Sequence, residues 1–253
     1  MASRSTNKIT TLLLDCDNTL VQSETLAFEA CAELTNEILA ARNIDLHFTG
    51  RQLQREFVGQ SFQAMMRSLE VNYGVSCNIS DAELEDYASM EDDRVISNLV
   101  EKLQSCEGAN AELERLVAAG SHQLAVVSSS ALRRVRASLE KAGQATFFHP
   151  SDVFSAADSL PVPTSKPDPA VYFHALKTMG KVAAECIAVE DSRSGATSAN
   201  RAGIITIGYT GACEDVEEAD ILRGVLEKAG CKLIMSNWTE FPNLLHQIET
   251  ELL

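Results

Sequence analysis

The sequence lacks the long hydrophobic runs that would place it in a membrane. Its longest continuous apolar runs, such as Leu12–Leu14 and Leu124–Val127, are far shorter than the ~20 residues that a membrane-spanning helix requires. Residues 1–10 hold two basic residues but no apolar stretch, so we expect no secretory signal there. Internal repeats and low-complexity tracts are also absent.

Basic charge is scarce. The chain has 21 Lys and Arg residues against 36 Asp and Glu residues, which gives a formal net charge of −15 at pH 7. Proteins that bind nucleic acid or anionic membranes usually present a basic face, so we expect neither partner. The acidic residues are concentrated in residues 81–101 and 214–228, a pattern typical of solvated helix faces.

Paired cysteines and metal-binding histidines are missing as well. The seven cysteines are scattered singly, without a CxxC pair, and the five histidines show no zinc-binding spacing. An odd number of separated cysteines is typical of a reducing compartment, so we expect a cytoplasmic protein without a disulfide framework. The remaining composition, 45% hydrophobic and 23% charged, is that of a globular protein with one large domain or two unequal ones.

What the sequence does contain is an alternation of short apolar runs and helical patterns. The runs are continuously apolar, as strands covered by helices on both faces should be. They comprise residues 9–14, 123–128, 186–189, 204–208 and 232–235. Helical patterns that each end at a glycine lie beside these runs, at residues 112–119, 131–142, 170–179 and 196–202. The order predicts an α/β fold with a doubly wound, Rossmann-like parallel sheet.

One long stretch after the first apolar run interrupts this alternation. It contains no evident strand, and its helical patterns cover residues 24–41, 51–71 and 81–103. The third pattern opens with a capping box formed by Ser80 and Glu83. A block of about 80 residues does not fit inside a compact crossover connection. We therefore predict an inserted helical cap domain at 22–105, a core domain at 1–21 and 106–253, and linkers near 19–23 and 104–110.

Polar side chains cluster where the apolar runs end. They are Asp15 and Asp17, the run Ser128–Ser130, Lys166 in a proline-rich loop, and the pair Glu190 and Asp191. Carboxyl ends of parallel strands meet at one sheet edge, where open α/β sheets bind ligands. The acidic side chains there repel one another, and a bound divalent cation would offset this repulsion. The hydroxyls and the lysine can hold a phosphate. Each has a local alternative: turn or capping roles for the aspartates, for Ser130 and for Ser192, and solvation for the lysine.

Taken in order, these residues resemble four motifs of a known family. Asp15-Cys-Asp17-Asn-Thr19-Leu20 resembles the DxDGT motif of the haloacid dehalogenase superfamily, and Ser128, Lys166 and Glu190-Asp191-Ser192 resemble the other three. The resemblance spans roughly residues 9–208, and the insert resembles the helical cap that follows the first motif. Asn18 stands in place of the usual glycine, and we expect it to tolerate a positive φ. Within this superfamily, the sequence most resembles phosphoglycolate phosphatases, sugar-phosphate phosphatases and β-phosphoglucomutases.

The resemblance implies a Mg²⁺-dependent reaction with an aspartyl-phosphate intermediate. In the family's pattern Asp15 is the nucleophile, and Asp17 protonates the leaving alcohol and then activates water. Mg²⁺ is held by Asp15, the backbone carbonyl of Asp17 and Asp191, with Glu190 near it. The transferring phosphoryl oxygens are held by Ser128, the N–H of Ser129 and Lys166.

These roles imply a phosphatase for a small phosphorylated metabolite such as a sugar, polyol or glycolate phosphate. A phosphomutase is the alternative, but β-phosphoglucomutases carry a histidine where this chain has Ala27 and an arginine shortly after the equivalent of Gly59. A phospho-acceptor module is a third alternative, against which the inserted block and Asp17 both argue. Gln60 is a candidate substrate contact, and Phe57 is either such a contact or a core residue of the cap. We expect a monomer, with a dimer as the alternative.

Overall fold

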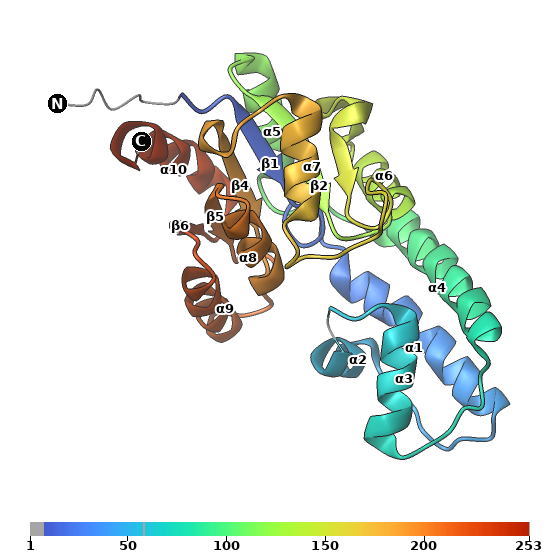
Figure 1. The fold of residues 1–253 in the computed structure, drawn as a ribbon. Coiled ribbons are helices and arrows are strands. Elements are labelled where there is room, and N and C mark those ends of the chain that lie inside the picture. The colour runs from blue at the N-terminus through green and yellow to red at the C-terminus, as the bar shows by residue number, and fades with distance from the viewer. Residues whose placement is uncertain (1–7, 58, 253) are drawn as a thin grey trace. The chain divides into compact units, whose positions relative to one another are not determined.

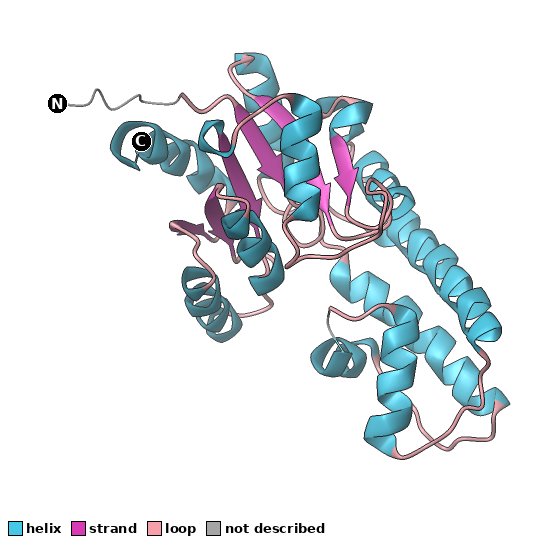
Figure 2. Cartoon of the chain, viewed as in Figure 1, coloured by secondary structure: helices cyan, strands magenta, loops and turns pink. Residues whose placement is uncertain are grey.

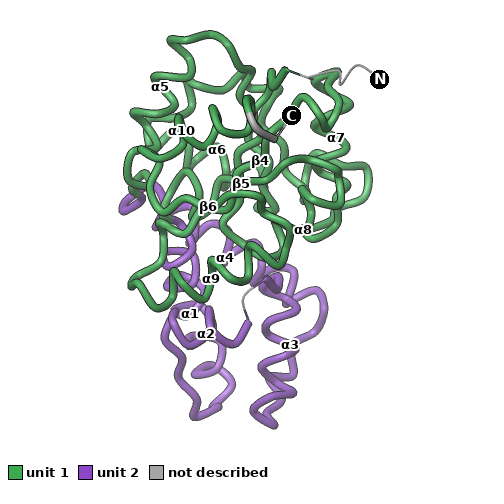
Figure 3. Tube along the Cα trace, turned by 90° about the vertical axis from the view of Figure 1, so that its left-hand side faces the viewer, with its two compact units in different colours: residues 1–22, 104–253 green, residues 23–103 purple. Residues whose placement is uncertain are grey.

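The computed structural model describes residues 8–57 and 59–252. The chain divides into two compact units (Figure 3). Unit 1 consists of residues 1–22 and 104–253, and unit 2 consists of residues 23–103. Within the described residues, no helix is both long enough and apolar enough to cross a membrane. The seven cysteines, all of them described, form no disulfide, as the sequence predicts.

Unit 1 is built on a six-stranded parallel sheet, which confirms the predicted α/β fold. In spatial order the strands are β3 (Val153–Ser155), β2 (Gln123–Ser128), β1 (Thr11–Leu14), β4 (Cys186–Glu190), β5 (Ile205–Tyr209) and β6 (Leu233–Met235). The strand order reverses between β1 and β4, where Leu14 pairs with Val189. Ligands of open α/β sheets bind beyond the carboxyl ends of such a pair.

The strands are largely apolar because helices cover both faces of the sheet (Figure 2). Every residue of β1 and β4 is buried. In Figure 1, α7 lies in front of the sheet and α5 behind it. The α-helices of unit 1 are α5 (Ala109–Ala119), α6 (Leu132–Lys141), α7 (Ala170–Met179), α8 (Arg193–Arg201), α9 (Val216–Lys228) and α10 (Phe241–Gln247). Short 3-10 turns occur at Ala145–Phe147, Pro150–Asp152, Ala183–Glu185 and Trp238–Glu240, and a π-helical turn at Ile248–Leu252.

The predicted strands and helix ends of unit 1 agree closely with these elements. Each of the five predicted strands overlaps an observed one, and Gln123–Ser128 is reproduced without change. The four glycines predicted to end helices, at 120, 143, 180 and 203, all have positive φ between 61° and 78°. Strand β3 is an addition that the sequence analysis did not predict.

Unit 2 is a helical unit with its own apolar core. Its helices are α1 (Glu24–Ala41), α2 (Gly50–Phe57), α3 (Phe62–Tyr73) and α4 (Asp81–Lys102). The fully or nearly fully buried members of its core cluster include Leu34, Ile38, Phe57, Met66 and Leu69. Phe57 is only 1% exposed, so the interpretation of this residue as part of the core holds.

The prediction of one continuous helix over residues 51–71 is wrong. The helix stops after Phe57, Gly59 has a φ of +83°, and α3 starts again with the Ser61 hydroxyl accepting a hydrogen bond from the Ala64 N–H at 3.3 Å. A positive φ is rarely compatible with a continuing helix, so the chain turns at the glycine. The predicted capping box of Ser80 and Glu83 at the start of α4 is confirmed.

Candidate active site

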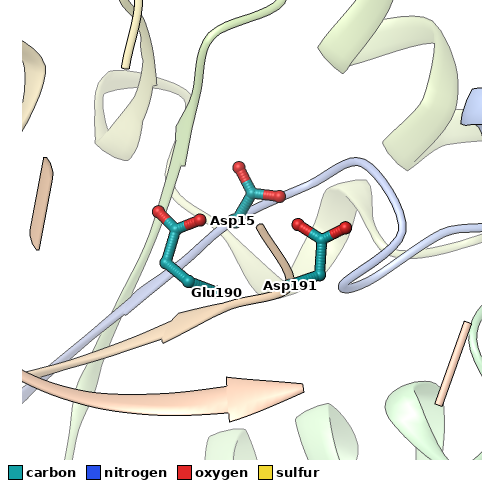
Figure 4. A group of neighbouring side chains, drawn as sticks. All are labelled: Asp15, Glu190 and Asp191. Carbon is teal, nitrogen blue, oxygen red and sulfur yellow. The ribbon is translucent and has the colours of Figure 1, made fainter. Parts of the chain in front are cut away.

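Three carboxylates meet beyond the ends of β1 and β4. Asp15 directly follows β1, Glu190 is the last residue of β4, and Asp191 follows it (Figure 4). One oxygen from each lies within 4.8 Å of the others. Asp15 is 6% exposed and Glu190 is fully buried. Carboxylates brought so close together with little water repel one another, so the cluster requires positive charge nearby.

Lys166 supplies one such charge from a distant part of the sequence. Its Nζ lies 2.6 Å from Asp15 Oδ1 and 2.7 Å from Glu190 Oε1, and it also donates a hydrogen bond to the Val127 carbonyl at 2.7 Å. The side chain is buried, so these charge-assisted contacts are shielded from solvent. Its backbone N–H donates to Ser129 Oγ at 3.1 Å, which ties the lysine loop to the end of β2.

Burial dominates the electrostatics of Asp15. Loss of water has the largest effect on its pKa, and the charges of Glu190 and Asp17 add to it. Together they outweigh the opposing effect of Lys166 and raise the pKa of Asp15 to about 7. Burial by itself would lower the pKa of Lys166, but the two carboxylates beside it outweigh that effect and raise the pKa above its ordinary value. The lysine therefore stays protonated, and its single positive charge faces the two buried carboxylates of Asp15 and Glu190.

Glu190 shows the same shortage of positive charge. Its Oε1 accepts a hydrogen bond from the Tyr172 hydroxyl in addition to the Lys166 contact. Among the described residues, none donates a hydrogen bond to the buried Oε2. A Cβ at Gly195 would lie 1.7 Å from that oxygen, so only glycine leaves room for the carboxylate. A buried carboxylate oxygen without a donor is costly, and a cation would offset this cost.

The cluster fits a divalent metal ion of the magnesium type. Its donor atoms are all carboxylate oxygens, which hard cations prefer over nitrogen or sulfur. The capping alternative does not account for Asp191, because Ser192 caps α8: its hydroxyl accepts the Gly195 N–H at 3.1 Å. Asp15, Glu190 and Asp191 are therefore the residues that could hold such an ion.

Asp17 lies against the serines that end β2. Its Oδ2 accepts hydrogen bonds from Ser130 Oγ at 2.7 Å and from Ser128 Oγ at 3.3 Å. The Ser130 N–H donates in turn to Ser128 Oγ at 3.0 Å. Two hydroxyl donors on one oxygen give this carboxylate a defined orientation.

The capping alternative for Ser130 is wrong. Helix α6 starts at Leu132, whose N–H donates to Asp158 Oδ2 at 2.6 Å, so the cap comes from a residue in the loop after β3. The contact between Ser130 and Asp17 is one that sequence reasoning missed. Its only signal is the run of three serines at the end of an apolar strand.

A tight turn separates Asp15 from Asp17. Asn18 has a φ of +53°, which confirms that it replaces the family's glycine in the left-handed region. The turn is closed by hydrogen bonds from the Asn18 N–H to the Val21 carbonyl at 2.7 Å and from the Leu20 N–H to the Cys16 carbonyl at 2.9 Å. Thr19 Oγ1 donates to Asp15 Oδ2 at 3.3 Å. The turn thus aims Asp15 at Lys166 and Asp17 at the serines.

The structure therefore brings together most of the residues singled out in the sequence. One cluster contains Asp15, Lys166, Glu190 and Asp191. The turn after β1 places Asp17 next to this cluster, and the end of β2 places Ser128 against Asp17. Gln60 belongs to unit 2, where it is exposed and its Oε1 accepts a hydrogen bond from Ser68 Oγ at 2.8 Å. Chemically, unit 1 offers a carboxylate that could act as a nucleophile, an adjacent ammonium and a second carboxylate that could transfer a proton.

Comparison with known sequences gives consistent matches. A family model described as "Hydrolase: haloacid dehalogenase-like hydrolase" matches residues 9–203. The 6-phosphogluconate phosphatase of Escherichia coli (strain K12) is 28% identical over 198 residues, which cover 78% of this chain and 81% of that protein. Protein CbbY of Rhodobacter capsulatus is 30% identical over 200 residues, which cover 76% of this chain and 82% of that protein.

Solved structures share the fold. A haloacid dehalogenase-like protein of unknown function from Agrobacterium tumefaciens superposes with a TM-score of 0.74 at 23% identity, over 95% of this chain and 99% of that one. CbbY from Rhodobacter sphaeroides, solved with phosphate, superposes with a TM-score of 0.71 at 21% identity, over 92% of this chain and 96% of that one. At these identities the likeness concerns the fold alone.

Proposed function

Because this chain belongs to the haloacid dehalogenase-like hydrolases, we propose that it is a Mg²⁺-dependent phosphatase that hydrolyses a small phosphorylated metabolite. The observation that carries the proposal is the buried contact of Asp15 with Lys166, beside Glu190 and Asp191. A sugar, polyol or glycolate phosphate is the proposed substrate class. Two relatives support a sugar-derived phosphate: one is named 6-phosphogluconate phosphatase, and a CbbY variant was crystallised with xylulose-(1,5)bisphosphate.

In the proposed reaction Asp15 is the nucleophile. One of its carboxylate oxygens attacks the phosphorus, an O–P bond forms, and the bond from phosphorus to the substrate alcohol oxygen breaks, which leaves an aspartyl-phosphate. Two like charges 4 Å apart repel by about 4 kcal/mol at an effective dielectric of 20, so this approach requires cations. Lys166 Nζ, which already contacts Asp15 Oδ1, is placed to stabilise the charge on the transferring phosphoryl group.

Asp17 is the proposed acid and base. In the first half-reaction its carboxyl gives a proton to the departing alcohol oxygen. In the second it takes a proton from the water that attacks the phosphorus, which releases phosphate and restores Asp15. The hydroxyls of Ser128 and Ser130 orient this carboxylate through Oδ2, and we further assign Ser128 and the Ser129 N–H to phosphate binding.

Asp15, Asp191 and the backbone carbonyl of Asp17 are the proposed Mg²⁺ ligands, with Glu190 beside them. When bound, Mg²⁺ would supply the positive charge that neutralises the carboxylate cluster and the incoming phosphate dianion. The Asp15 pKa of about 7 without a metal fits this assignment, because a nearby cation favours the charged carboxylate.

A phosphate-release screen tests the proposal. Purified protein would be assayed with Mg²⁺ on sugar, polyol and glycolate phosphates and on p-nitrophenyl phosphate. We expect release on at least one natural ester, loss of activity with EDTA, recovery with Mg²⁺ and inhibition by Ca²⁺, whose larger coordination number could engage both Asp15 oxygens. Full activity in EDTA would contradict the metal site. Activity that depends on an added sugar bisphosphate would instead support the phosphomutase alternative.

A further inference from the structure

The single tryptophan of the chain lies outside the matched residues 9–203 and packs against the loop of the proposed nucleophile. Trp238 is fully buried, and its indole Nε1 donates a hydrogen bond to the Thr19 carbonyl at 2.9 Å. Thr19 is also fully buried, and its hydroxyl donates to Asp15 Oδ2 at 3.3 Å. Two hydrogen bonds through Thr19 therefore connect the indole to Asp15, and the first of them joins residues 219 positions apart in the sequence.

The indole is held firmly from its other sides. Its ring lies 5.4 Å from that of Phe241 and 6.1 Å from that of Tyr209, measured between centroids. The 3-10 turn that carries it is capped, because Asn237 Oδ1 accepts the Thr239 N–H and Glu240 Oε1 accepts the Asn237 N–H, each at 2.9 Å. A donor on so well supported an element is pre-organised for its acceptor.

The same residue also restricts the segment through which the chain returns from unit 2. A Cβ at Gly108 would lie 3.2 Å from Trp238 Cβ, so glycine allows this close packing at the start of α5. Two residues earlier, the Cys106 N–H donates to the Leu20 carbonyl at 2.9 Å. Trp238 therefore supports the loop of Asp15 in two ways. It binds the Thr19 carbonyl directly, and it packs against Gly108, close to the Cys106 N–H that binds the Leu20 carbonyl.

We propose that Trp238 is a positioning residue of the phosphatase reaction. Its N–H holds the Thr19 carbonyl, so the Thr19 hydroxyl stays directed at Asp15 Oδ2 while Lys166 holds Oδ1. An isosteric side chain that lacks the N–H would fill the same core space without donating to Thr19, and this difference separates positioning from packing. The catalytic part of this inference rests on the proposed function. Displacement of a reacting group by about 1 Å can cost up to ~100-fold in rate.

An isostere of tryptophan provides the sharpest test. Since the chain has one tryptophan, expression in a tryptophan auxotroph supplied with 3-benzothienyl-alanine changes residue 238 alone and replaces its N–H by sulfur. We expect kcat on p-nitrophenyl phosphate to fall about tenfold with KM within about twofold. Amides of residues 18–21 should exchange faster with deuterium, while those of β1 and β4 should not.

Phe241→Leu is the matched control, because it loosens the same aromatic cluster but keeps the Trp238 N–H that donates to Thr19. It should lower Tm while kcat stays within about twofold of the wild-type value. In a Thr19→Val background, which lacks the hydroxyl that links Trp238 to Asp15, the isostere should lower kcat little further.

Unchanged kcat and exchange in the isostere protein would overturn the inference, and so would losses of kcat that multiply fully with Thr19→Val. A wild-type protein that releases phosphate from no tested ester would contradict the proposed function instead. In that case faster exchange at residues 18–21 in the isostere protein would still support the hydrogen bond, and unchanged exchange would overturn it.

Discussion

The ion pairs of Lys166 in unit 1 differ sharply in burial from the ion pairs of unit 2. In unit 1, the side chains of the Lys166–Asp15 pair are 4% and 9% exposed, and Glu190 on the same lysine is fully buried. In unit 2, the Arg94–Glu37 pair is 31% and 60% exposed, and its N–O distance of 2.6 Å is just as short. Distance alone therefore does not distinguish these pairs; burial does.

Burial determines how much an ion pair contributes to the stability of the fold. Exposed pairs contribute about 0–1 kcal/mol to stability, because water and salt screen them and long side chains lose entropy. Buried charges must be desolvated, which can outweigh their attraction, so a fold that retains them has a reason other than stability. The Arg94–Glu37 pair of unit 2 is thus a surface feature, while the buried pairs of Lys166 in unit 1 are the ones that we associate with the proposed reaction. The following variants test this contrast.

The largest effect is expected at Asp15. Asp15→Asn keeps the shape of the side chain but removes the attacking anion, so kcat should fall by at least ~10³-fold on every substrate that the wild-type enzyme hydrolyses. Steady-state phosphate release measures this. A variant that folds and turns over within a few-fold of wild type would show that Asp15 is not the nucleophile.

Asp17→Asn should separate the two aspartates. It removes the proton donor and acceptor, so hydrolysis of alkyl phosphates should fall by about 10²–10⁴-fold. The loss should be smaller for p-nitrophenyl phosphate, whose leaving group needs no proton. Rates on the two ester types, compared in one preparation, give this difference. Equal losses on both would argue against Asp17 as the general acid.

A change in pH should expose the cost of burying Asp15. Its pKa is about 7 in the metal-depleted fold and ~3.9 in an unfolded chain, so between these values the folded state binds the extra proton. The wild-type protein should therefore lose stability as pH rises through this window. The Asp15→Asn variant has no carboxyl at this position, so it should not show this loss of stability. In EDTA, the Tm of the variant relative to wild type should be higher at pH 8 than at pH 5. A pH-independent difference would contradict the assignment, and Mg²⁺ should raise the wild-type Tm at pH 8.

The smallest effect is expected in unit 2. Arg94→Met should change the free energy of unfolding by less than about 1 kcal/mol and leave phosphate release unaltered. The hydrogen bond from Arg94 lowers the pKa of Glu37, so any stabilisation should be present at neutral pH and vanish as pH falls through the glutamate range. Urea titrations at pH 7 and pH 3 measure this. A loss of several kcal/mol would remove the contrast between the units.

Much of this architecture could be predicted because it depends on local patterns. Continuously apolar runs and glycine-terminated helices can be recognised from short stretches of sequence. The same holds for the turn that contains Asp15, Asp17 and Asn18. Strand β3 has the sequence Val-Phe-Ser, which lacks the longer continuous apolar run that marks the predicted strands. Gly59 and Ser61 did mark the break between α2 and α3, but the apolar spacing on both sides suggested one helix.

Contacts between distant residues could not be predicted. Asp158 takes the capping role that was considered for Ser130, because tertiary structure brings the loop after β3 to the start of α6. The bond from Trp238 to Thr19 has no local signal at all. The burial that distinguishes Lys166 from a solvated lysine is likewise a property of the assembled sheet edge.

The most direct test of the central claim is to locate the phosphoryl group during turnover. Wild-type enzyme would be mixed with substrate and Mg²⁺, quenched in acid within the first turnovers, and mapped by peptide mass spectrometry with borohydride reduction of acyl phosphates. The account predicts a phosphoryl group on Asp15, converted to homoserine at that position by borohydride, and no modification in Asp15→Asn. A phosphoryl group on another residue, or full turnover by the Asp15→Asn variant, would contradict it.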